Sequence, residues 1–250
     1  MPTAQRKIIA IGGGSMLDNS TRNIDQRIVQ LSGKKKPNAL FIPTASSDDV
    51  NYARVFELVY GERLGCRTDV LYLLKEKTTR DEAKEKIRRA DIIFVGGGNT
   101  LKMMRRWRTL GVDRLLKQAY REGKVCCGSS AGALCWFHYG HSDSLFYYNP
   151  ENWKWIRVKC LGLVPFLLCP HYLKERRDED FRNMVQRVGG MGIAVDDCAA
   201  FEIIDDRIRV ISSKPEAQGF KVYKHRGKVR QIQLPKDGAY MRLEELRGLK

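Results

Sequence analysis

The sequence predicts an α/β protein with a mostly parallel central sheet that is covered by helices on both faces. Through the first half of the chain, short apolar runs typical of buried strands alternate with segments whose apolar residues recur at helical spacing. The last third instead contains paired strand-like runs, which suit an antiparallel extension of the sheet. A length of 250 residues fits one domain, residues 1–250, and we see no strong internal boundary.

Five strands and five helices are expected in alternation up to Cys127. Thr79 and Glu82 form a capping box, the usual start of a helix. We expect strands over Lys7–Gly13, Asn38–Pro43, Asp69–Leu74, Asp91–Val95 and Lys124–Cys127. We expect helices around Ile24–Leu31, Tyr52–Val59, Thr79–Ile87, Met103–Trp107 and Val112–Arg121.

The C-terminal third is expected to be mainly β. Gly192–Asp197 is apolar and predicts a buried strand. Ala199–Ser212 predicts two strands joined at Asp205–Asp206, and Phe220–Leu234 predicts a hairpin that turns near Arg226–Gly227. We interpret these strands as the antiparallel extension of the main sheet.

The chain is strongly basic, with 45 Lys and Arg against 29 Asp and Glu and a formal net charge of +16. Clustered cations would indicate a nucleic-acid partner. Here the basic residues are spread over separate segments and are not interleaved with stacking aromatics. We therefore expect a basic enzyme without a nucleic-acid partner. No apolar run reaches 18 residues, so we expect no membrane span.

The cysteines predict a reducing compartment. Their number is odd, 7, they form no C-x-x-C pair, and several lie in apolar runs. We expect no disulfide framework, zinc site or other cofactor. Met1–Lys7 lacks the apolar stretch of a signal peptide, so we expect a cytoplasmic protein that is a monomer or a homodimer.

The pentapeptide Gly128–Gly132 follows the pattern G-x-S-x-G, with Ser130 at its centre. It is preceded by a strand-like run and followed by an apolar, helix-competent one. A serine at a tight strand-to-helix turn needs small neighbours, and its hydroxyl projects above the carboxyl ends of the strands. The pattern predicts a nucleophile elbow, although a flexible turn would carry the same residues.

A nucleophilic serine needs a base and an acid. His171 directly follows an apolar strand-like run, and it is the histidine best placed to meet Ser130. Two acids, Asp196 and Asp197, end the strand-like run of residues 192–195. The chain order Ser, His, Asp differs from that of the α/β-hydrolases, so we do not expect that fold.

An oxyanion hole needs two backbone N–H groups that converge on one point. Ala131, the residue after the nucleophile, supplies one. The second is expected from Val95–Thr100, whose three glycines allow close approach to a ligand. Glycines before a helix also suit a phosphate, but this stretch lacks both the G-x-G-x-x-G spacing and the Walker lysine.

Together, "VGGGNT", "GSSAGA", "CPHY" and "AVDDCA" resemble the peptidase E and cyanophycinase family of serine peptidases over about Lys7–Arg209. The resemblance implies a three-layer sandwich like that of class I glutamine amidotransferases. It also implies Ser130 as nucleophile and His171 as base.

The resemblance implies roles for further residues. Gly98 and Ala131 match the oxyanion positions, while Asn99 and Asp143 match substrate-binding ones. Asp197 stands where the family usually has glutamate, so Asp196 and Glu202 remain alternatives for the acid.

The sequence thus predicts a serine peptidase that hydrolyses short peptides, with aspartyl dipeptides as candidate substrates. One alternative is a thiol enzyme that uses Cys126 or Cys127, which lie close to the elbow. Another is a non-catalytic module that binds a nucleotide or RNA through its glycine loops and basic surface.

Overall fold

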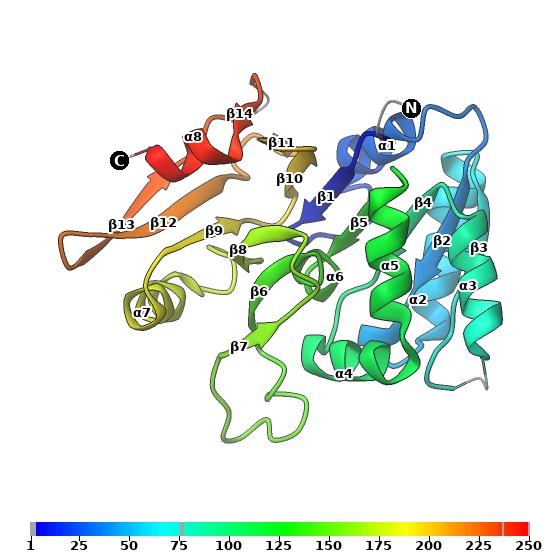
Figure 1. The fold of residues 1–250 in the computed structure, drawn as a ribbon, viewed down its shortest axis with the longest axis horizontal. Coiled ribbons are helices and arrows are strands. Elements are labelled where there is room, and N and C mark those ends of the chain that lie inside the picture. The colour runs from blue at the N-terminus through cyan, green and yellow to red at the C-terminus, as the bar shows by residue number, and fades with distance from the viewer. Residues whose placement is uncertain (1–3, 76–77, 237, 250) are drawn as a thin grey trace.

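The structure, a computed structural model, describes residues 4–75, 78–236 and 238–249, which form two mixed β-sheets with helices packed around them (Figure 1). The main sheet has the order β14-β11-β10-β1-β5-β4-β2-β3. Its strands are β1 (Lys7–Ile11), β2 (Asn38–Ile42), β3 (Arg67–Val70), β4 (Ile92–Val95), β5 (Val125–Ser129), β10 (Ala199–Ile204), β11 (Arg207–Ser212) and β14 (Met241–Arg242).

Strands β1, β5, β4, β2 and β3 are parallel to one another, as predicted. Strands β10, β11 and β14 extend the sheet in antiparallel pairing from β1. The predicted antiparallel extension is therefore confirmed for Ala199–Ser212. Asp205, with a φ of 55°, makes the turn between its two strands.

A second sheet, with the order β13-β12-β9-β8-β6-β7, was not predicted. Its strands are β6 (Phe137–Ser142), β7 (Ile156–Lys159), β8 (Val164–Cys169), β9 (Met191–Val195), β12 (Gly219–His225) and β13 (Lys228–Gln233). The assignment of β9, β12 and β13 to the main sheet was wrong. They pair with one another and with β8, because the chain changes sheet between β9 and β10.

Helices cover both faces of the main sheet (Figure 1). The helices in the part of the chain that the structure describes are α1 (Arg22–Leu31), α2 (Val50–Phe56), α3 (Arg80–Arg89), α4 (Thr100–Leu110), α5 (Val112–Arg121), α6 (Ala131–Leu134), α7 (Asp178–Val188) and α8 (Leu243–Gly248). The 3-10 helix η1 covers Thr44–Ser46, and α2 continues as the π-helix η2 (Glu57–Arg63). The buried residues of α1 and α2 pack on one face, and those of α3, α4 and α5 on the other.

Two further predictions need correction. Strand β3 ends at Val70, earlier than expected, because the Asp48 carboxylate accepts hydrogen bonds from the N–H groups of Leu73, Leu74 and Lys75. The helix expected after Ser130 is the single turn α6, since the chain then enters β6. Such a short helix contributes little dipole at its N-terminus.

The two sheets meet where the chain crosses between them, in the middle of the view of Figure 1. The first crossing leads from β5 through α6 to β6, and the second leads from β9 to β10. The chain crosses again between β11 and β12 and between β13 and β14. One face of the second sheet shares a buried apolar core with the main sheet, and α7 covers the other face. Strands β5 and β10 flank β1 on its two sides. Residues in the first two crossings therefore lie close to the end of β1.

Candidate functional site

Ser130 occupies the first crossing, directly after β5, and its backbone has a φ of 55° and a ψ of −115°. A non-glycine residue at positive φ is strained, and such strain is concentrated at functional sites. The Ser130 N–H donates to the Ile11 carbonyl at 3.0 Å. A Cβ on Gly132 would lie 1.9 Å from the Val95 carbonyl oxygen, so this turn requires a residue without a side chain.

His171 follows β8 and also has a positive φ, of 51°. Its N–H donates to the Gly12 carbonyl at 3.2 Å. Its ring Nδ1 lies 2.5 Å from Oδ1 of Asp197, in the second crossing. Both side chains are largely buried, with 17% of His171 and 13% of Asp197 exposed.

The end of β1 contacts all three of these residues. Ile11 bonds the Ser130 backbone, and Gly12 bonds the His171 backbone. A Cβ on Gly13 would lie 2.1 Å from Oδ1 of Asp197. Residues far apart in the sequence therefore gather around three consecutive residues at the carboxyl end of a central strand, which is where open α/β sheets bind ligands.

Asp197 is the carboxylate that faces His171, whereas the two alternatives are engaged elsewhere. Asp196 is buried and accepts hydrogen bonds from the N–H groups of Leu173 and Gln218. Glu202 is fully buried in β10 and pairs with Arg27 and Arg209. Both therefore serve the fold in this structure.

The charge of Asp197 is stabilised by its neighbours. Burial acts to raise its pKa, but hydrogen bonds from His171 and Lys174 lower the pKa to about 2. Lys174 Nζ lies 2.7 Å from the outer oxygen of Asp197. Asp197 therefore stays ionised at neutral pH, as a partner of an imidazole must.

A second carboxylate, Glu175, lies 3.8 Å from His171 Nδ1. It is held by Arg177, which is buried and also contacts Asp143 and the Trp155 ring. The segment after His171 therefore adds Lys174 and Glu175 to the site. Neither residue was predicted from the sequence, although their position shortly after His171 was a usable signal.

The glycine loop after β4 lies beside Ser130. A Cβ on Gly97 would be 3.4 Å from the Ser130 Cβ and 4.0 Å from its Oγ. Gly98 has a φ of 130°, a backbone conformation that glycine adopts readily and other residues rarely do. The Tyr52 ring packs against this loop, since a Cβ on Gly96 would lie 2.9 Å from its Cε1, and burial raises the pKa of Tyr52 to about 12. Tyr52 therefore supports the loop from the α2 side.

Asn99 and Asp143 are both tied to the surrounding structure. The Asn99 side chain caps α4 by accepting from Lys102 N–H at 2.9 Å and donates to the Ser144 carbonyl at 3.3 Å. Asp143 Oδ2 lies 3.4 Å from Arg177 Nη2. Ala131 is buried at the start of α6.

The thiols close to Ser130 are poorly suited to nucleophilic attack. Cys126 and Cys127 are buried in β5, and burial raises the pKa of both far above the usual value. The thiolate is the reactive form of cysteine. The geometry therefore favours Ser130 over the thiol alternative.

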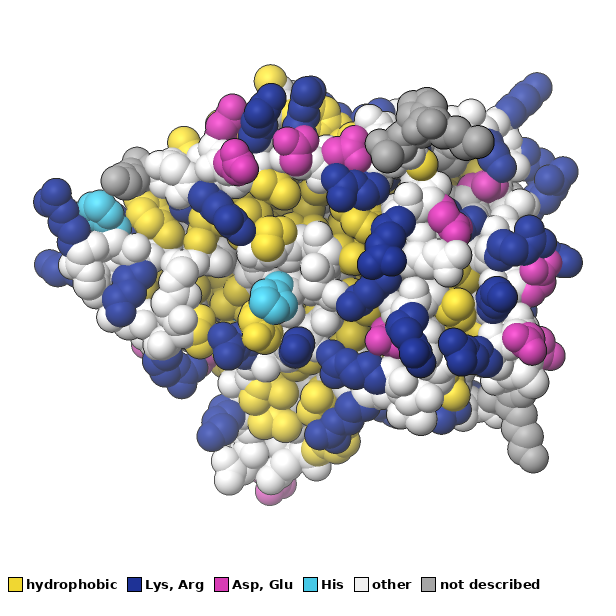
Figure 2. Space-filling view, viewed as in Figure 1, with side chains coloured by type: hydrophobic (Ala, Val, Ile, Leu, Met, Phe, Trp, Pro, Cys, Tyr) yellow, Lys and Arg dark blue, Asp and Glu magenta, His cyan; other side chains and the backbone are white. Residues whose placement is uncertain are grey.

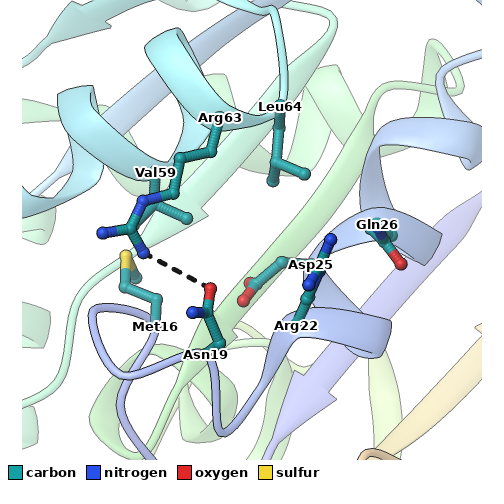
Figure 3. A pocket seen from close by; sticks show the side chains of 8 residues that line it. All are labelled: Met16, Asn19, Arg22, Asp25, Gln26, Val59, Arg63 and Leu64. Atoms are coloured by element: carbon teal, nitrogen blue, oxygen red, sulfur yellow. Dashed lines mark hydrogen bonds between the residues drawn. The ribbon is translucent and has the colours of Figure 1, made fainter.

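Three cavities surround the loop that follows β1. A cavity of about 790 Å³ is lined by His171, Asp197 and several charged side chains. A smaller one of about 270 Å³ has mostly apolar walls, to which Ser15, Thr21, Tyr52 and Ser129 add hydroxyl groups. A third, of about 230 Å³, contains Asp25 (Figure 3).

Figure 3 shows the Asp25 carboxylate pointing into this third pocket, on the side of Asn19. It accepts hydrogen bonds from the hydroxyls of Thr21 and Tyr60 at 2.7 and 2.8 Å. Arg63 bonds Asn19 at 3.3 Å across the rim. Asp25 therefore ties α1 to η2 beside the loop that follows β1.

The chain is similar to known peptidases over most of its length. The model of peptidase family S51 matches residues 8–211. The chain is 33% identical over 234 residues to the uncharacterized peptidase YgaJ of Bacillus subtilis, covering 92% of this chain and 97% of that protein. It is 31% identical over 119 residues to the "Probable alpha-aspartyl dipeptidase" of Drosophila melanogaster, covering 43% and 47%.

A solved structure shares the fold. The peptidase from an acI-B1 Actinobacterium superposes with a TM-score of 0.70 at 16% identity, covering 96% of this chain and 97% of that one. The α/β class and the resemblance to peptidase E are therefore confirmed. From the family match over residues 8–211 and from these relatives, the chain belongs to peptidase family S51 and is a serine peptidase.

Proposed function

We propose that the chain hydrolyses short peptides through a triad of Ser130, His171 and Asp197. Ser130 Oγ attacks the scissile carbonyl, and His171 takes its proton and later gives it to the leaving amine. Asp197 accepts the Nδ1–H hydrogen bond, which fixes the tautomer and stabilises the imidazolium. The observation that carries this proposal is the 2.5 Å contact of His171 with Asp197, taken together with the positive φ of Ser130.

We assign the oxyanion hole to the backbone N–H groups of Gly98 and Ala131. Support comes from the approach of the glycine loop to Ser130 and from the position of Ala131 directly after it. Asn99 acts on the substrate indirectly, because it fixes the end of the glycine loop that follows β4. Asp143 shapes the rim of the site next to Arg177. The fold relation to class I glutamine amidotransferases is part of this proposal.

The candidate substrates include aspartyl dipeptides, because relatives carry the names peptidase E and alpha-aspartyl dipeptidase. The family membership favours this enzyme over a non-catalytic nucleotide- or RNA-binding module. The predicted reducing, cytoplasmic compartment remains part of this proposal. In the part of the chain that the structure describes, no helix is long and apolar enough to cross a bilayer.

The test is hydrolysis of a dipeptide panel by the wild-type protein and by Ser130→Ala. We expect the variant to lose on the order of 10³-fold or more in kcat/KM. A fluorophosphonate probe should label the wild type and leave Ser130→Ala unlabelled. Undiminished hydrolysis by the variant would contradict the assignment of Ser130.

A further inference from the structure

We propose that the apolar pocket beside Ser130 binds an apolar side chain of the substrate, on a residue that flanks the scissile bond. The apolar pocket is the cavity of about 270 Å³ whose walls include Met16, Leu17, Tyr52, Val55, Phe94 and Ser129. This inference deepens the proposed function and rests on it. It assigns a substrate class, short peptides with a leucine-like or aromatic residue next to the cleaved bond.

The position of the pocket connects it to the nucleophile. Ser129, one of its walls, directly precedes Ser130 in the chain. Ile11, another wall, accepts the Ser130 N–H hydrogen bond at 3.0 Å. Tyr52 packs against the glycine loop at Gly96, and Gly97 in the same loop packs on Ser130. A substrate carbonyl held at Ser130 therefore places a neighbouring side chain within reach of this pocket.

The chemistry of the walls selects the side chain. Within the described residues, the lining contains the hydroxyl groups of Ser15, Thr21, Tyr52 and Ser129 but no Asp, Glu, Lys, Arg or His. Phe94 is fully buried, and Met16 is nearly so. A carboxylate placed there would lose its hydration without gaining a cationic partner, whereas a leucine side chain would gain roughly 10-fold or more in binding from burial.

The neighbouring cavity has the opposite character and shares Gly14 and Ser15 with the apolar pocket. Lys174, Lys214 and Glu216 contribute charges to its walls. The charged groups of a short peptide have partners in this cavity. The two cavities thus separate the apolar side chain of a substrate from its charged ends.

The first experiment measures kcat/KM for dipeptides in which one residue is glycine and the other is leucine, phenylalanine, aspartate or lysine, in both orders. We expect leucine or phenylalanine to exceed aspartate by about 10-fold or more in one order. Equal rates, or a preference for aspartate in both orders, would overturn the inference while leaving the triad intact.

A charge added to the wall should change this preference. Leu17 is 46% exposed and lines the pocket, so Leu17→Lys is compatible with folding. We expect it to lower kcat/KM for the leucine peptide and to raise it for the aspartate peptide. Val50→Lys is the matched control, since Val50 is 45% exposed on α2 and lies outside the pocket walls. An identical substrate profile for Leu17→Lys and wild type would contradict the inference.

A binding measurement separates this inference from the proposed function. Calorimetry on Ser130→Ala compares the same leucine and aspartate peptides without turnover. Tighter binding of the leucine peptide, weakened by Leu17→Lys, supports the pocket even if the wild type hydrolyses none of the panel. Absence of any such preference in Ser130→Ala counts against the pocket, whatever the activity of the wild type.

Discussion

Gly13 packs directly against the His171–Asp197 pair, and its lack of a side chain leaves room for that pair. A Cβ there would lie 2.1 Å from the Asp197 Oδ1 and 2.3 Å from the His171 ring. Real Cβ atoms do not approach other atoms so closely, so one of the two side chains would have to move.

We therefore predict that Gly13→Ala lowers kcat by about 100-fold or more, because a displacement of about 1 Å in a catalytic group is this costly. Steady-state kinetics measure the effect. The control is Gly61→Ala, where the new Cβ makes only ordinary contacts of 3.5 Å with Thr68. Full activity in Gly13→Ala would show that the pair does not need its present position.

Asp197 is expected to matter through its charge and its hydrogen bond to His171. Asp197→Asn keeps the size of the side chain but no longer stabilises the imidazolium, so kcat should fall on the order of 10³- to 10⁴-fold. The control is Lys174→Ala. Lys174 is 71% exposed, and its removal should cost less than about 10-fold. Equal losses in the two variants would argue against Asp197 as the acid.

Sequence alone could select Ser130 and His171 but could not choose among the acids. Asp196 and Asp197 are consecutive at the end of a strand, where the alternation of side chains gives way to a turn. Cys198, at a φ of 64°, makes that turn and directs Asp197 toward His171. The roles of Lys174 and Tyr52 depend on tertiary contacts that no local pattern encodes.

At the scale of the element, α1 is attached to η2 through a buried carboxylate. Burial raises the pKa of Asp25 to about 6 from 3.8, although hydrogen bonds from Thr21 and Tyr60 lower it. Between these two values the folded state binds a proton that the unfolded state does not. This group's contribution to stability is therefore fully present below about pH 4 and is lost as the pH rises through about 6.

We predict that the wild type loses stability relative to Asp25→Asn as the pH rises from about 4 to 7. The change in the difference of unfolding free energies should be about 3 kcal/mol, from a shift of about two pKa units. Denaturant titrations of both proteins across this range measure it. The difference would not vary with pH if Asp25 titrated normally in the folded protein.

The parallel strands were predicted more successfully than the second sheet. Apolar runs and helical spacing are local signals, and they located β1, β2, β4 and β5 to within a few residues. The run after Ser130 was interpreted as helical, yet Phe137–Ser142 is strand β6, because it pairs with β7 and β8. Strand pairing between distant segments outweighs local propensity here.

At the scale of the whole molecule, the net charge of +16 is dispersed. Figure 2 shows Lys and Arg side chains distributed over one entire face, with Asp and Glu among them. Such a distribution produces a positive field without forming a single basic groove. Such a field attracts anions. The attraction weakens as salt is added, because the screening length is about 10 Å at 0.1 M ionic strength.

We therefore predict that kcat/KM for a dipeptide of net negative charge falls several-fold between low salt and 0.5 M NaCl, on the order expected for electrostatic steering. A dipeptide with no net charge should change little over the same range. Initial rates at substrate concentrations well below KM measure both. A parallel decline for the two peptides would indicate a general salt effect on the enzyme.

The backbone conformation of Ser130 has a cost for the folded protein as a whole. Holding a residue with a side chain at a φ of 55° and a ψ of −115° opposes folding by about 1–3 kcal/mol. Glycine adopts this conformation freely, so Ser130→Gly should melt at a higher temperature than Ser130→Ala in calorimetry, while both are inactive. A chain selected for thermal stability alone would carry glycine at this turn. On the proposed function, the serine there lowers stability in exchange for activity.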